Sequence, residues 1–137
     1  MPTIGYVPSP ATSMRDRRRS AGISITALAA AETLQREKNI SAEVVDLRTI
    51  VPLDRATVIE SVAKTGRAVI ADECPLSFGV AAEIAATLAE SAFKHLKAPV
   101  VRVAVPDVPI PFSPPLEAEL IVTPQKIAAG VLKALGR

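Results

Sequence analysis

Three short apolar runs, separated by segments with helical spacing of apolar residues, constrain the fold of this chain most strongly. The runs consist mainly of Val, Ile and Ala, and they lie at 43–47, 68–72 and 100–105. The run at 68–71 is continuously apolar, which is typical of a strand buried on both faces of a parallel sheet. Helical patterns precede, separate and follow them at 24–37, 55–65, 79–96 and 124–135. This alternation predicts an α/β fold with a mostly parallel sheet and helices on both faces.

Local signals mark the ends of two of these helices. Asp54 is a favourable N-cap for the helix at 55–65, and Gly66 is a natural stop behind it. Thr123 offers a capping hydroxyl for the last helix, and Pro124 suits its first helical position. Both helices are therefore expected to begin and end close to these residues.

Two segments do not follow the alternation. Residues 1–21 hold three prolines and then the cluster Arg15-Asp16-Arg17-Arg18-Arg19, and only Thr3–Val7 has a strand-like pattern. We therefore predict an irregular N-terminal segment at 1–21, least ordered over 8–20, and one domain at 22–137. Residues 106–122 carry five prolines and are expected to be extended and irregular.

Composition narrows the classes of function. The chain has 137 residues, 49% of them hydrophobic, which suffices for the core of one domain. Outside the N-terminal arginines the charges nearly balance, so no basic surface for nucleic acid is expected. A single Cys excludes an internal disulfide, and no apolar run reaches the ~20 residues of a membrane span. These features predict a cytoplasmic protein without nucleic-acid or membrane partners.

Polar residues gather where the predicted strands end, and open α/β sheets bind their ligands beyond the carboxyl ends of strands. The residues found there are Asp46, Arg48, Asp72, Glu73, Cys74 and Asp107. The acids could bind a metal or serve in acid–base chemistry. More commonly such residues form turns and ion pairs or face another protein chain. We therefore predict no catalytic, cofactor-binding or metal-binding residues, and we retain as sheet-edge candidates Asp46, Arg48, Glu73 and Asp107.

A nucleophilic role for Cys74 would need a base nearby, and the only histidine is His95. His95 lies at the end of the predicted helix at 79–96. A histidine in such a position is more often a partly buried structural residue than a catalytic base. Gly79 opens that helix, but no glycine-rich phosphate-binding pattern accompanies it. A hydrolase or metal enzyme built on Cys74 or the acids is therefore the least favoured hypothesis.

Three longer motifs are more specific than any single residue. They are Ala42–Asp54 (AEVVDLRTIVPLD), Asp72–Ala86 (DECPLSFGVAAEIAA), and Ala98–Val103 together with Pro106–Phe112 and Leu116-Glu117. In order and spacing they resemble the transketolase carboxyl-terminal domain family. The middle motif is most similar to the beta subunits of 2-oxoacid dehydrogenases of the pyruvate, branched-chain or acetoin type. The resemblance runs from about Ser24 to Leu135.

The resemblance implies a three-layer αβα sandwich with a five-stranded, mostly parallel sheet. It also implies a subunit-assembly domain that is not catalytic in isolation. The complete enzyme decarboxylates a 2-oxoacid and transfers the acyl group to lipoamide, with thiamine diphosphate and Mg held by other domains. The implied partners are a second copy, the alpha subunit and the lipoyl acyltransferase core. The family's first strand is expected just before Ser24, where this sequence is a poor strand, so Thr3–Val7 is a candidate replacement.

An assembly domain needs an apolar surface beyond its own core. The best candidates in the proline-rich segment are Val108, Ile110, Phe112 and Leu116. The alternative is that Ile110 or Phe112 folds back onto the core of the domain. A free-standing remnant that binds a small ligand or a protein is the alternative function. Which 2-oxoacid the complete enzyme would use does not follow from these residues.

Overall fold

The computed structural model describes residues 1–6 and 14–137, and the side chains of residues 1, 2 and 23–137. Its sheet has the strand order β2-β1-β3-β4, and all neighbouring strands are parallel. The strands are β1 (Thr3–Tyr6), β2 (Glu43–Asp46), β3 (Ala68–Pro75) and β4 (Val101–Val105). The strands predicted at 43–47, 68–72 and 100–105 are thus confirmed within a few residues.

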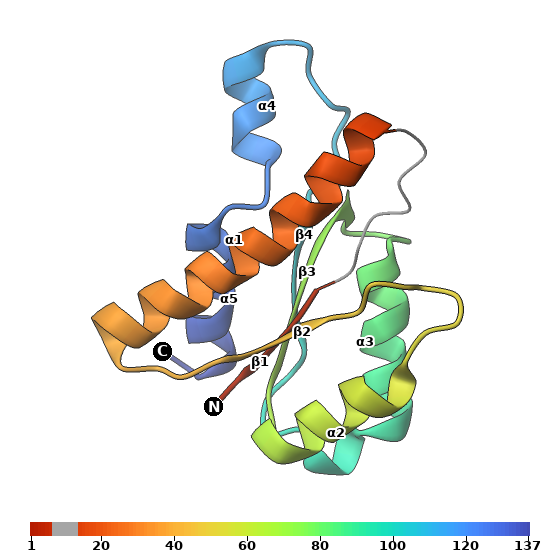
Figure 1. Ribbon diagram of the computed structural model, residues 1–137, viewed down its shortest axis with the longest axis vertical. Helices are drawn as coiled ribbons and strands as arrows, with labels where there is room; N and C mark the ends of the chain where they lie inside the picture. Colours follow the sequence, from red (N-terminus) through yellow and green to blue (C-terminus); the bar gives the residue numbers. More distant parts are fainter. Residues whose placement is uncertain (7–13) are drawn as a thin grey trace.

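The helices cover both faces of this sheet (Figure 1). They are α1 (Met14–Lys38), α2 (Arg55–Thr65), α3 (Val80–Ser91), the 3₁₀ turn η1 (Phe93–His95), α4 (Pro114–Leu120) and α5 (Pro124–Ala134). Helices α1 and α5 pack on one face, and α2 and α3 pack on the other. This arrangement is the predicted three-layer αβα sandwich.

Strand β3 shows how one sheet serves two apolar clusters. Its side chains alternate, so Val69 and Ala71 join the cluster with α1 and α5, whereas Ala68 and Ile70 join the cluster with α2 and α3. All four are almost completely buried. A strand with both faces covered is expected to be apolar throughout, which explains the continuous run in the sequence.

The predicted ends of α2 and the predicted start of α5 agree with the structure, whereas the helix predicted at 79–96 ends at Ser91 and is followed by η1. The Asp54 carboxylate accepts a hydrogen bond from the Thr57 amide at 3.1 Å, and Gly66 ends α2 with a left-handed φ of 75°. The Thr123 hydroxyl accepts from the Lys126 amide at 3.3 Å, and Pro124 opens α5. The two side-chain caps satisfy amides that have no partner within the helix, and the Gly66 amide donates to the Val62 carbonyl at the end of α2.

The prediction for the N-terminal segment was wrong in part. Strand β1 is confirmed, and it occupies a central position between β2 and β3 rather than an edge. Helix α1, however, begins at Met14, so residues 14–21 are helical and not irregular. Arginine is a good helix former and no proline lies between Pro10 and Pro52, so helix propensity outweighs the like-charge repulsion on which the prediction was partly based. The rest of the segment expected to be least ordered, 8–13, lies outside the described residues.

The proline-rich segment also differs from its prediction. Instead of remaining extended throughout 106–122, it forms α4, with Pro114 and Pro115 in the first turn. Proline is tolerated there because the amide it lacks would have no helical partner. The described residues form a sheet of four strands, so the fifth strand that the resemblance implies is not found among them.

Candidate interface at the carboxyl edge of the sheet

Asp72 is the most deeply buried polar residue at the carboxyl edge of the sheet. Its side chain has no exposed surface. One carboxylate oxygen accepts a hydrogen bond from the Cys74 amide at 2.9 Å, and the other accepts from the Ala81 amide at 3.0 Å. Ala81 lies in the first turn of α3, where amides lack helical partners and the helix dipole favours a negative group. Asp72 therefore links the end of β3 to the start of α3.

Gly79 allows this link because the loop after β3 passes very close to the helix start. A Cβ atom at Gly79 would lie 2.4 Å from the Pro75 carbonyl oxygen and 3.4 Å from a carboxylate oxygen of Asp72. The first distance is far below van der Waals contact, and the obstacle is backbone. Gly79 is thus explained by close packing and not by phosphate binding.

The loop after β3 is also fastened to the end of β4. Asp107 accepts two hydrogen bonds from Ser77, one from the hydroxyl at 2.6 Å and one from the amide at 2.9 Å. The hydrogen bond from the Ser77 hydroxyl contributes most, and the bond from the Ser77 amide next, to holding the pKa of Asp107 below its usual value. On the same loop Leu76 donates its amide to the Val105 carbonyl at 2.7 Å and accepts from the Arg102 guanidinium at 2.6 Å. The loop is therefore held firmly by its neighbour strand.

Phe78 stands at the tip of this loop and was missed by the sequence analysis. Its side chain is as exposed as in an extended chain, at 102%. Its φ is 61°, a left-handed conformation that is uncommon for residues other than glycine, asparagine and aspartate. The signal in the sequence was a large aromatic residue directly before a helix-starting glycine, in a chain with 3% aromatic residues. Phe78 belongs with the interface candidates.

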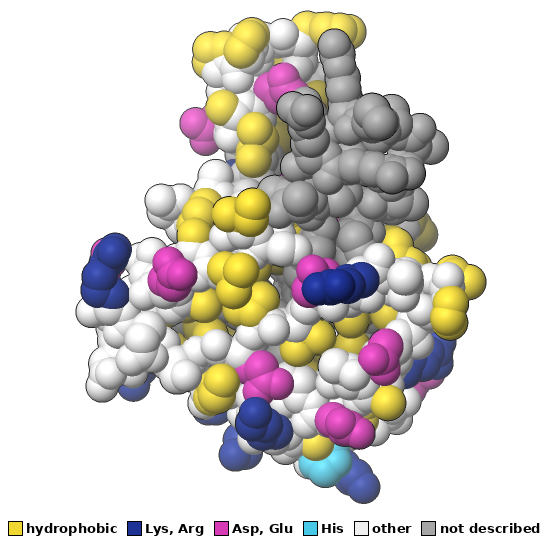
Figure 2. Space-filling model, in the orientation of Figure 1, with side chains coloured by type: hydrophobic (Ala, Val, Ile, Leu, Met, Phe, Trp, Pro, Cys, Tyr) yellow, Lys and Arg dark blue, Asp and Glu magenta, His cyan; other side chains and the backbone are white. Residues whose placement is uncertain are grey.

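The four apolar candidates of the proline-rich segment are all exposed. Phe112 is 105% exposed and Ile110 is 69% exposed, and Val108 and Leu116 also lie at the surface. The alternative that Ile110 or Phe112 folds back onto the core is therefore excluded by the structure. We call residues 106–121 the arm, because α4 has no buried residue and stands apart from the layers in Figure 1. Figure 2 shows hydrophobic side chains gathered over α4 and over the middle of α1.

The arm is anchored to the body by hydrogen bonds at its end rather than by a buried core. The Lys126 ammonium donates to the carbonyls of Glu119 and of Ile121, the latter at 2.8 Å. A cation at the carboxyl end of a helix is favoured by the helix dipole. Between the arm and the sheet edge lies a cavity of about 300 Å³. Its lining is mostly aliphatic, from Val105, Ile110, Leu120 and Ile121, with Glu73 and Glu117 as its acids.

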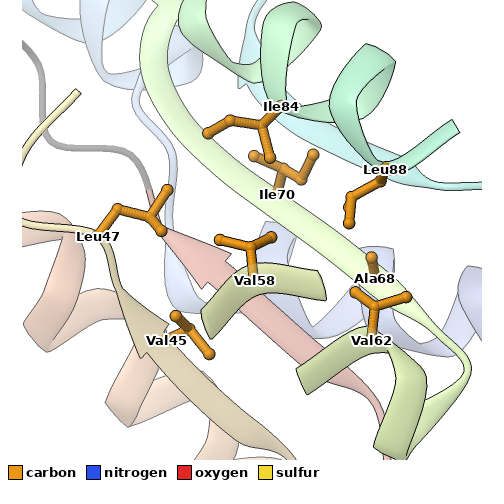
Figure 3. Close-up of a pocket in the computed structure, with 8 residues that line it drawn as sticks. All are labelled: Val45, Leu47, Val58, Val62, Ala68, Ile70, Ile84 and Leu88. Atoms are coloured by element: carbon orange, nitrogen blue, oxygen red, sulfur yellow. The ribbon is translucent and has the colours of Figure 1, made fainter. Parts of the chain in front are cut away.

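The second apolar cavity is a packing defect of the core (Figure 3). It measures about 10 Å³ and is lined only by aliphatic side chains, among them Ile84 and Leu88 of α3. A water molecule needs at least ~10–15 Å³ and polar partners. The void is therefore expected to be dry, and it offers no ligand site.

The remaining sheet-edge candidates do not converge on one centre. The Asp46 carboxylate accepts from the Arg48 amide at 3.1 Å and from the Ser24 hydroxyl at 3.3 Å. The interpretation of the acids as turn formers agrees with Asp46 and Asp72, each of which accepts from the amide two residues later. Asp107 instead accepts from the amide of Ser77, 30 residues away in the sequence. Glu73 faces the cavity under the arm instead.

The structure also separates Cys74 from His95. Cys74 precedes α3, whereas His95 follows it in η1. The 12 residues of α3 span about 18 Å, so the two side chains lie at opposite ends of a helix. Among the described residues, no group of three or more His, Cys, Asp or Glu side chains could hold a metal ion.

The carboxyl edge does not fit thiamine diphosphate and its Mg²⁺. A bound diphosphate needs oxygen ligands for the metal and free amides for the phosphates. Here no three His, Cys, Asp or Glu side chains of the described residues converge as metal ligands, and the Ala81 amide at the start of α3 already donates to Asp72. No helix in the described part of the chain is long and apolar enough to span a membrane.

Comparison with known proteins assigns the family. The family described as "Transketolase, C-terminal domain" matches residues 22–127. The acetoin:2,6-dichlorophenolindophenol oxidoreductase subunit beta of Cupriavidus necator is 48% identical over 109 residues, which are 80% of this chain and 32% of that protein. The pyruvate dehydrogenase E1 component subunit beta of Bacillus subtilis is 51% identical over 86 residues, 63% of this chain and 26% of that protein.

A third relative and a solved structure complete the comparison. The 2-oxoisovalerate dehydrogenase subunit beta of Bacillus subtilis is 41% identical over 106 residues, 77% of this chain and 32% of that protein. The solved structure, "Split gene transketolase, inactive beta4 tetramer", has a TM-score of 0.69 and 28% identity, and the match covers 98% of this chain and 37% of that one. The chain thus spans about a third of the length of its curated relatives. It belongs to the transketolase C-terminal domain family and corresponds to the C-terminal domain of 2-oxoacid dehydrogenase beta subunits.

Proposed function

We propose that this domain joins the subunits of a thiamine diphosphate-dependent 2-oxoacid dehydrogenase and has no catalytic activity of its own. The complete enzyme would decarboxylate a 2-oxoacid oxidatively and transfer the acyl group to lipoamide. The observation that carries the proposal is the row of exposed apolar side chains on the arm, with Phe112 fully in solvent. Contiguous apolar surface of this kind usually marks a protein contact.

The shape of the arm supports an assembly role. Helix α4 buries none of its residues against the domain, so its own stability gains little from tertiary packing. Its prolines restrict the chain before any partner binds, which lowers the entropy lost on association. An apolar helix presented in this way is stabilised when a second protein surface covers it.

The proposed partners follow from the relatives. The structural neighbour is described as a tetramer of beta chains, which supports a second copy as one partner. The alpha subunit and the lipoyl acyltransferase core are the other proposed partners. A free-standing binding module is not favoured, because the curated relatives are beta subunits about three times as long as the match.

The cytoplasmic location stays a prediction.

The isolated chain is expected not to bind thiamine diphosphate. The carboxylates at its sheet edge are engaged by amides, and the described residues offer no metal-binding group. Isothermal titration of the chain with thiamine diphosphate and Mg²⁺ should therefore give only the heat of dilution. Saturable binding in the micromolar range would show that this domain contributes to the cofactor site.

The chain is expected to form dimers or larger species at micromolar concentration, and Phe112→Asp is expected to shift it toward monomer. Burying the new carboxylate at an apolar contact would be unfavourable, whereas Phe112 supports no core in the free domain. Sedimentation velocity measures the association, and circular dichroism checks the fold. The control is Phe93→Asp, which places the same charge on another exposed phenylalanine away from the arm. A strictly monomeric wild type would contradict the assembly role.

A further inference from the structure

We draw no further inference here: the strongest candidate, the mostly aliphatic cavity of about 300 Å³ between the arm and the carboxyl edge of the sheet, belongs to the candidate interface already described, and nothing in the described part of the chain shows what fills it.

Discussion

Replacing Asp72 by alanine is expected to lower the free energy of unfolding by about 3 kcal/mol, because one buried and one partly buried amide would lose their acceptor at once. The carboxylate has no exposed surface, and it accepts from Cys74 in the loop and from Ala81 in α3. An unsatisfied buried donor costs about 1–3 kcal/mol. The loss of a negative group at the start of α3 adds to this cost. Urea titration followed by circular dichroism measures the change.

Asp54→Ala is the matched control, because Asp54 also caps a helix of this domain but is exposed. Water can replace its carboxylate, so the midpoint of the urea transition should move much less than for Asp72→Ala. Asp72→Asn should fall between the two, since one amide oxygen remains as an acceptor. Equal shifts for Asp72→Ala and Asp54→Ala would mean that water reaches the start of α3.

The core of this fold could be predicted from periodicity and capping residues. Strand β3 and helix α2 are set by signals within a few residues of chain, namely a continuous apolar run and the pair Asp54 and Gly66. Such signals do not depend on distant contacts. The start of α1 could not be predicted in this way, because the sequence there gives conflicting signals. Prolines and like charges disfavour a helix, whereas arginine has a high helix propensity.

The interface was predicted in part, for a similar reason. The apolar interface residues of the arm could be predicted from the sequence. Large aliphatic and aromatic side chains between closely spaced prolines do not fit a regular helix or strand that would bury them in a core. The sequence marks Phe78 only as an aromatic residue before a helix-starting glycine, and its full exposure is seen in the structure alone. The loop that carries Phe78 is held by hydrogen bonds between Ser77 and Asp107, which lie 30 positions apart. Its left-handed backbone could not be predicted either, because phenylalanine rarely adopts this conformation. The role of Asp72 in joining β3 to α3 depends in the same way on where the chain folds.

Leu88→Ala is expected to destabilise the domain by about 3 kcal/mol. Leu88 is 1% exposed, and Figure 3 shows it beside Ile70 and Val62 in the cluster between the sheet, α2 and α3. Substitution of a buried leucine by alanine costs about 2–5 kcal/mol, part of it from the cavity that remains. The cost here should not be at the low end, because a void of about 10 Å³ already adjoins Leu88 and the deleted carbon atoms would enlarge it.

Leu116→Ala makes the same chemical change in α4, where the leucine is 57% exposed. It removes no core contact, so the urea midpoint of the monomer should stay within the scatter expected for surface substitutions, about 0.5 kcal/mol. Self-association should respond in the opposite order: Leu116→Ala should weaken it, whereas Leu88→Ala should leave the association of the folded fraction unchanged. Urea titration at low protein concentration and sedimentation velocity in buffer separate the two effects. A large loss of monomer stability in Leu116→Ala would show that the arm packs as core, and that the exposed apolar row belongs to the fold rather than to an interface.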